Sequence, residues 1–219
     1  AAEIIFKSND VAVMVGGTGL YIDAFCNGID EIPAIDEDLR KNILLSFETN
    51  GIEWLQDEIE KKDPEYFKTG EIKNPQRLLR ALEVKLSTGQ SITEYQKKEK
   101  KKTPFKIIKI GLELPKEQLH HKINERTDAM MQQGLLDEVI SLMPFRNLNA
   151  LNTVGYRELF AHLTGQNSLE ESIAKIKLNT RHYAKRQLTW FKKDKEVNWI
   201  NATTDDLSFI KMCTGLCVS

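Results

Sequence analysis

The residues best suited to chemistry lie in the turn Gly16-Gly17-Thr18-Gly19, between an apolar run over residues 11–15 and a helical pattern. Five consecutive apolar residues are typical of a strand buried on both faces of a parallel sheet. A glycine turn that opens a helix offers free backbone N–H groups and the positive end of the helix dipole to an anion. Thr18 adds a hydroxyl. The spacing alone fits an anion site and a plain tight turn equally well, and no Gly-Lys-Ser/Thr follows as in a Walker A loop.

A second feature is the distribution of charge, because the net charge of −1 by itself indicates no polyanionic partner. Residues 172–193 contain no Asp or Glu, whereas residues 30–60 are acidic. The basic residues of the first segment are Lys175, Lys177, Arg181, Lys185, Arg186, Lys192 and Lys193. Such asymmetry permits contact with nucleic acid, although a run of charge is commonly a solvated helix face.

Composition excludes several classes of protein. The 219 residues suffice for one large or two small domains. No apolar run approaches the roughly 20 residues of a membrane span, and we expect no signal peptide. The three cysteines form no CxxC pair, and the four histidines have no metal-ligand spacing. We expect a reduced, cytoplasmic, monomeric protein without a membrane or metal site in this chain; its start at Ala1 instead of Met suggests a piece of a longer protein.

The elements that must position these residues suggest an α/β fold with a helical insertion. Strands are predicted over residues 11–15, 105–114 and 196–200, and only helices over residues 36–102. The domains expected are therefore a core over residues 1–30, an all-helical insertion over 31–103, and the core continued over 104–219. KKEKKK at residues 97–102 is expected to be a tether, and the tail after residue 201 a helix.

One helix has clear sequence signals at both ends, and another has one at its start. Asn74 followed by Pro75 predicts a helix start, and Gly89 its end. Gln76, Arg77 and Arg80 share one side of this helix. The longest helix is predicted to begin after Ser168, with Glu171 completing a capping box. Its inward stripe ends with Gln187 and Trp190, so Trp190 is expected in the core, while Lys177, Arg181 and Lys185 form a basic stripe on another face.

Five segments resemble the tRNA dimethylallyltransferases, and together they cover most of the chain. They are GGTGLY at residues 16–21, NPQRLLRALE at 74–83, INERT at 123–127, NTVGYRE at 152–158 and AKRQLTWF at 184–191. The resemblance implies a P-loop NTPase-like parallel-sheet core, truncated at its N-terminus, with an all-helical insertion. It also implies transfer of a dimethylallyl group from dimethylallyl diphosphate to N6 of the adenine 3′-adjacent to the anticodon of tRNA, with Mg²⁺ as cofactor.

The resemblance also implies residue roles. Thr18 and Arg126 are the expected catalytic residues, although an ion pair of Arg126 with the neighbours of Glu125 or with Asp128 is an equally open interpretation. The expected substrate and tRNA contacts, including the anticodon stem-loop, are Gly16, Gly17, Thr18, Arg40, Gln76, Arg77, Leu78, Leu79, Arg80, Val154, Gly155, Tyr156, Arg157, Arg181, Lys185, Arg186 and Gln187. No GxxxxGK[ST] and no convincing base carboxylate occur in the sequence. We therefore expect most Mg²⁺ ligands to lie outside these residues, and the chain to be inactive alone.

Three other functions stay open. An adenylate isopentenyltransferase acts on free adenine nucleotides and needs no RNA surface. A non-catalytic RNA-binding remnant would keep the basic residues without the chemistry. A nucleotide kinase is disfavoured by the absent P-loop lysine.

Overall fold

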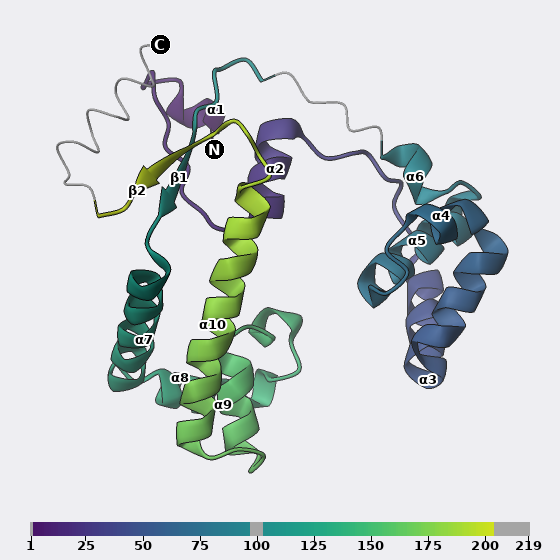
Figure 1. Cartoon of the computed structure of the whole chain (residues 1–219). Helices are drawn as coiled ribbons and strands as arrows, with labels where there is room; N and C mark the ends of the chain where they lie inside the picture. The colour runs from purple at the N-terminus through teal and green to yellow at the C-terminus, as the bar shows by residue number, and fades with distance from the viewer. Residues whose placement is uncertain (1, 97–102, 204–219) are drawn as a thin grey trace. The chain divides into compact units, whose positions relative to one another are not determined.

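The computed structural model describes residues 2–96 and 103–203, and its contacts divide the chain into two units (Figure 1). The core unit comprises residues 1–19 and 105–219, and the helical unit comprises residues 20–104. The predicted tether at residues 97–102 and the predicted tail helix lie outside the described residues. No helix in the part of the chain that the structure describes is long and apolar enough to cross a membrane.

The described residues of the helical unit form helices and no strand, as predicted for residues 36–102. After α2 (Gly19–Asn27), which starts at the boundary between the units, come α3 (Glu37–Lys62), α4 (Pro64–Thr69), α5 (Pro75–Thr88) and α6 (Ile92–Tyr95). Gly51 interrupts α3 with a φ of +76°, so α3 consists of two helical segments on either side of this glycine. Pro64 begins α4, because proline is well tolerated in a first helical turn.

Helix α5 has the ends that the sequence predicts, and it carries the core of the helical unit. The Asn74 side chain accepts a hydrogen bond from the Arg77 N–H, and Gly89 closes the helix in the left-handed conformation. Leu78 and Leu82 on α5 are fully buried against Leu55 and Ile59 of α3. Burial of four such side chains contributes roughly 6–12 kcal/mol before entropy is counted. The pairing of α3 with α5 is therefore the stable frame of this unit.

The core unit is mostly helical around a small parallel sheet. It contains α1 (Ala2–Ile5), β1 (Lys109–Glu113), α7 (Lys116–Gln132), α8 (Leu135–Leu142), the 3₁₀ turns η1 (Met143–Phe145) and η2 (Asn149–Leu151), α9 (Tyr156–Leu163), α10 (Leu169–Phe191) and β2 (Val197–Asn201). Strands β1 and β2 pair in parallel from Lys109↔Val197 to Glu113↔Asn201. Both confirm predicted strands, although β1 is shorter than predicted. The wider P-loop NTPase-like sheet stays a prediction.

The strand predicted over residues 11–15 is wrong. These residues have no regular secondary structure, and Val13 and Val15 are 81% and 91% exposed. An apolar run becomes a buried strand only when neighbouring strands satisfy its backbone groups and cover its faces. Within residues 2–96 and 103–203 the sheet has two strands, and neither pairs with this run.

The helices of the core unit have their own apolar centre. Val139 of α8, Leu159 of α9 and Ile176 of α10 are almost completely buried and pack together. At the other end of the unit, Lys109 Nζ binds Asp194 at 2.7 Å and Glu196 at 2.8 Å. Burial would lower the pKa of Lys109, but the two carboxylates outweigh it and raise this pKa. These contacts join β1 to the segment that leads from α10 into β2.

Candidate functional site

The glycine turn lies against the C-terminal part of α10. Gln187 Nε2 donates a hydrogen bond of 2.8 Å to the carbonyl oxygen of Gly17. A Cβ atom at Gly17 would lie 2.3 Å from Gln187 Nε2, and one at Gly19 would lie 2.3 Å from Trp190 Cδ1 and Nε1. Gly19 is therefore needed because the rigid indole leaves no room for a Cβ, whereas a Cβ at Gly17 would displace the flexible end of the Gln187 side chain and break its hydrogen bond. Gly16 and Thr18 are exposed, so the Thr18 hydroxyl is open to a ligand.

The prediction that Trp190 belongs to the core is wrong. Trp190 is 44% exposed, and the edge of its indole ring lies against Gly19. The helical stripe that predicted its burial holds nearer the start of α10, where Ile176 is buried. Near the end of α10 the polar Gln187 and the indole meet backbone of the glycine turn instead of apolar side chains.

The basic stripe of α10 is divided between two environments. Lys177 Nζ binds Asp128 of α7 at 2.6 Å, and Arg181 Nη2 donates to Asn124 Oδ1 of α7 at 2.7 Å. These two cations therefore face α7. Lys185, one turn further along, is exposed.

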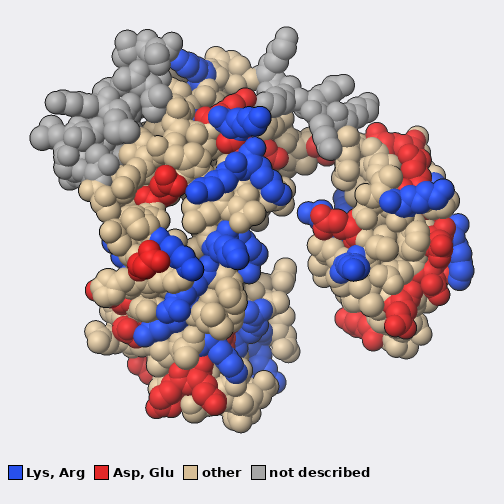
Figure 2. Space-filling view, in the orientation of Figure 1, with Lys and Arg blue, Asp and Glu red and all other residues tan. Residues whose placement is uncertain are grey.

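The C-terminal part of α10, which carries Gln187, also carries exposed cations and an exposed aromatic ring. Lys185 and Arg186 are exposed, and the Arg186 guanidinium lies 5.7 Å from the centroid of the Tyr183 ring. Figure 2 shows Lys and Arg side chains gathered along the unit that contains α10. Exposed cations bind phosphate oxygens without reading sequence, and an exposed ring can stack on a base. We call these three exposed residues, Tyr183, Lys185 and Arg186, the α10 basic face; Arg186 lies over Tyr183, and Lys185 continues the row of Lys177 and Arg181.

Residues Val154, Gly155, Tyr156 and Arg157 form the start of α9, and the buried Glu158 organises them. Glu158 Oε2 accepts the Gly155 N–H at 2.8 Å, and Oε1 accepts Asn179 Nδ2 at 2.7 Å and Arg157 Nη2 at 3.2 Å. Burial would raise the pKa of Glu158, but these hydrogen bonds outweigh it and hold the pKa below its usual range. Sequence reasoning missed Glu158; its position three residues after Gly155, as in a capping box, is the signal that could have found it.

The other members of this segment have separate contacts. The Tyr156 hydroxyl donates to Glu138 Oε1, and this hydrogen bond raises the Tyr156 pKa. Val154 is half-buried, Gly155 is buried with a φ of +105°, and Arg157 is exposed. Glycine suits this left-handed backbone. The segment is therefore held rigidly at Gly155 and Tyr156 and presents Arg157 outward.

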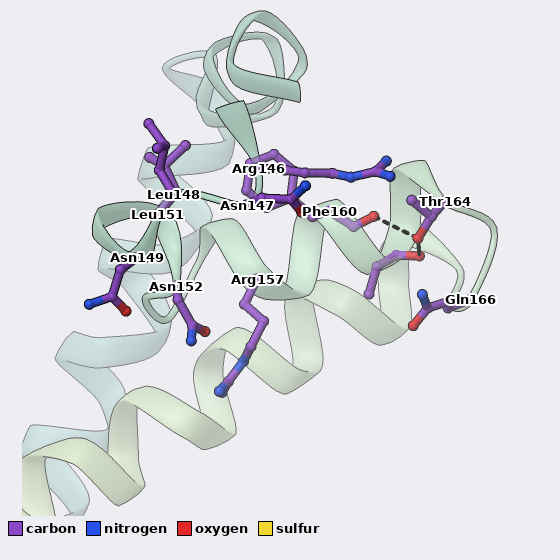
Figure 3. Close-up of a pocket in the computed structure, with 11 residues that line it drawn as sticks. Arg146, Asn147, Leu148, Asn149, Leu151, Asn152, Arg157, Phe160, Thr164 and Gln166 are labelled. Carbon is purple, nitrogen blue, oxygen red and sulfur yellow. Dashed lines mark hydrogen bonds between the residues drawn. The ribbon is translucent and has the colours of Figure 1, made fainter. Parts of the chain in front are cut away.

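A pocket of about 550 Å³ adjoins Arg157 (Figure 3). Its lining combines two arginines with four carboxamides: Arg146, Arg157, Asn147, Asn149, Asn152 and Gln166. Figure 3 shows Arg146 and Arg157 pointing in different directions. The polar groups therefore do not converge on one ligand atom.

In the helical unit, Arg40 and Arg80 meet at one carboxylate. Arg40 Nε and Nη2 donate to Glu83 Oε1 and Oε2 at 3.2 and 3.3 Å, and Arg80 Nη1 donates to Oε2 at 3.3 Å. Gln76 is exposed, and Arg77 forms an ion pair with Glu71. The predicted shared side of Gln76, Arg77 and Arg80 on α5 therefore stays accessible.

Leu78 and Leu79, which were expected among the tRNA contacts, are buried side chains of the core of the helical unit. Their side chains hold α5 in place and are not available to a ligand.

Arg126 is exposed on α7, and Asp128 pairs with Lys177 instead of with Arg126. Of the alternative ion pairs expected for Arg126, the one with Asp128 is therefore wrong. Within the described ranges, no three His, Cys, Asp or Glu side chains group as a metal ion requires. The described residues therefore do not identify ligands for Mg²⁺, and no chemical step is assigned to that ion.

Residues 1–194 match the family model described as IPP transferase. The chain is 46% identical over 199 residues to tRNA dimethylallyltransferase 1 of Phocaeicola vulgatus, covering 91% of this chain and 66% of that protein. It is 47% identical over 195 residues to the tRNA dimethylallyltransferase of Christiangramia forsetii, covering 89% of this chain and 65% of that protein. The chain thus spans about two thirds of the length of the curated relatives it matches.

Solved structures of tRNA isopentenylpyrophosphate transferases also match the chain. The tRNA isopentenylpyrophosphate transferase of Bacillus halodurans matches with a TM-score of 0.58 and 32% identity, over 92% of this chain and 63% of that one. The corresponding protein of Staphylococcus epidermidis matches with a TM-score of 0.59 and 31% identity, over 98% and 71%. A eukaryotic dimethylallyltransferase described as acting on tRNA shares the fold, with a TM-score of 0.72 and 24% identity over 94% of this chain and 54% of that one.

Proposed function

Because the chain belongs to the IPP transferase family, we propose that it supplies the RNA-docking surface and the adenine-facing wall of a tRNA dimethylallyltransferase. The reaction is transfer of a dimethylallyl group from dimethylallyl diphosphate to N6 of the adenine 3′-adjacent to the anticodon. The partner is the anticodon stem-loop, bound by a monomer in the cytoplasm.

The observation that carries the proposal is the contact between the glycine turn and α10. Gln187 holds Gly17, and the two residues before Gln187, Lys185 and Arg186, are exposed cations. A nucleic acid that binds Arg186 through a phosphate, directly before Gln187 on α10, would therefore lie close to Thr18, the exposed hydroxyl of the turn, while Lys185 would bind the backbone further round the helix. Phosphate contacts fix the register of the RNA, and register decides which base can reach the turn.

The proposed reaction makes three physical demands. The target adenine must leave its stack to reach an enclosed site. Its exocyclic amine is a weak nucleophile, so a carboxylate must accept its proton during attack. Departure of the diphosphate concentrates negative charge that cations and N–H donors must stabilise.

The chain offers groups for the first and third demands. The Thr18 hydroxyl can form a hydrogen bond with the edge of the purine. Arg126 is exposed, and its planar guanidinium can donate two N–H groups at once to the oxygens of a diphosphate. We assign no carboxylate of this chain as the base. The cofactor proposed for the whole enzyme is Mg²⁺, bound mostly by residues outside this chain.

A chimaera tests the function. Residues 1–194 would replace the matching region of the Phocaeicola vulgatus relative, which then supplies the remaining third of its own length. The chimaera is incubated with unmodified tRNA and dimethylallyl diphosphate, and the tRNA nucleosides are analysed by mass spectrometry. Prenylated adenosine next to the anticodon is the expected product. A folded chimaera that prenylates free AMP but not tRNA would contradict the proposal.

The 219 residues alone are proposed to be inactive, because the sequence contains neither a GxxxxGK[ST] loop nor an assigned base. The same assay applied to the isolated chain should yield no prenylated adenosine. Measurable turnover would show that a carboxylate within these residues serves as the base.

A further inference from the structure

The ion-pair cluster Arg40–Glu83–Arg80 joins two helices of the helical unit. Arg40 comes from α3, and Glu83 and Arg80 come from α5. Glu83 accepts two N–H groups from Arg40 and one from Arg80, all within 3.3 Å. The Glu83 side chain is 10% exposed, whereas those of Arg40 and Arg80 are 55% and 35% exposed. The carboxylate is therefore enclosed, and the two guanidinium groups border on solvent.

The arrangement leaves binding capacity unused. A guanidinium has five N–H donors, so each arginine keeps most of its donors free for an anion. The cluster carries two positive charges and one negative charge, and its outer side presents the positive ones. Because both arginines bind the same carboxylate, their guanidinium groups lie side by side, which suits the oxygens of a phosphodiester.

The presence of Glu83 is not explained by long-range attraction. A carboxylate beside two arginines lowers the positive potential that a phosphate experiences, so simple electrostatics predicts tighter RNA binding without it. A long arginine side chain, however, loses roughly 2 kcal/mol of rotamer freedom when a phosphate orders it. If Glu83 already holds both arginines, that entropy is lost on folding and not on binding.

We propose that Glu83 is a positioning residue that orders Arg40 and Arg80 into one phosphate clamp for the RNA backbone. The clamp rests on the proposed function, because it takes the backbone of the docked tRNA as its ligand. Glu83 itself touches no RNA; it acts through the two arginines.

The test is fluorescence anisotropy with the 219-residue chain and a dye-labelled anticodon stem-loop, at several salt concentrations. Glu83→Gln keeps the size of the side chain but removes its charge and replaces one acceptor by an NH₂ group. The inference predicts binding weaker by about 3–10-fold and a salt slope shallower by about 1, as one phosphate contact is lost. The matched control, Glu48→Gln, removes the same charge from an exposed position on α3 and should leave binding equal or slightly tighter.

A double-mutant comparison separates positioning from general stability. In an Arg40→Ala/Arg80→Ala background, Glu83→Gln should change RNA affinity no further, because no clamp remains to be ordered. An equal loss in both backgrounds would overturn the inference, and so would a Glu83→Gln variant that binds RNA as tightly as the wild type with an unchanged slope. If the wild-type chain itself showed no salt-dependent binding, the proposed function would fail, and the clamp with it.

Discussion

Gln187 and Gly17, which are 170 residues apart in the sequence, are joined by a hydrogen bond of 2.8 Å from Gln187 Nε2 to the Gly17 carbonyl oxygen. This bond connects the helix that carries the basic face to the turn that carries Thr18. The turn is therefore placed by a side chain of the proposed RNA-docking helix.

Gln187→Ala should loosen the glycine turn. A single neutral hydrogen bond is worth about 1 kcal/mol net, so the free energy of unfolding of the core unit should fall by about this amount. Urea unfolding measures this. Gln118→Ala, at an exposed position of α7, is the control and should leave the free energy of unfolding unchanged. Equal stability of the two variants would refute the connection.

Gly19→Ala should destabilise the core unit through a clash with Trp190. The added Cβ would lie 2.3 Å from two ring atoms, and such overpacking costs about 1–3 kcal/mol. Urea unfolding of Gly19→Ala gives the loss of unfolding free energy. In a Trp190→Ala background the same substitution should cost much less, because the ring is gone. An undiminished loss in that background would point to a cause other than the indole.

Acid should destabilise the start of α9 through Glu158. Its pKa is lower in the folded than in the unfolded chain, so its contribution to the free energy of unfolding is complete above the unfolded value near 4.5 and is lost as the pH falls through the folded pKa. Urea unfolding between pH 7 and pH 3 should show a smaller decline for Glu158→Gln than for the wild type. Parallel declines would mean that the hydrogen bonds from Gly155 and Asn179 do not favour the charged form.

Lys185→Ala and Lys177→Ala should affect different properties, although both lysines lie on α10. Lys185 is exposed, so its removal should weaken binding of the anticodon stem-loop about equally for all loop sequences and lower the salt slope by about 1. Lys177 binds Asp128, so its loss should reduce stability and leave the slope unchanged. Thermal unfolding and RNA titration of both variants measure the two effects. If both substitutions lowered the salt slope of RNA binding equally, Lys177 and Lys185 would act as one RNA-binding surface.

Local signals predicted the helices well. The ends of α5 follow from Asn74, Pro75 and Gly89, because capping and proline geometry act within a few residues. The capping box of Ser168 and Glu171 marks the start of α10 in the same way. Long-range pairing was not predictable in this way. The run over residues 11–15 has strand composition, yet whether a strand forms depends on neighbours that no local pattern contains.

The site was predicted only in part, for a similar reason. Motif resemblance identified Arg40 and Arg80 as separate contacts, but their meeting at Glu83 depends on how α3 packs on α5. Helical periodicity assigned Trp190 to the core, since it treats every turn of α10 as facing the same surroundings. The turn at Gly17 and Gly19 replaces apolar neighbours there, and the indole lies beside backbone instead.

The most direct test of the central claim, docking of an anticodon arm beside the glycine turn, is a filter-binding titration of the 219-residue chain. The ligand is an anticodon stem-loop with unmodified adenine, titrated at several salt concentrations and in competition with AMP. We expect a plot of log affinity against log salt with a slope of about −2 or steeper, as two or three phosphate contacts require, and no displacement of the RNA by equimolar AMP. Salt-independent binding, or displacement of the stem-loop by AMP at equal concentration, would contradict it.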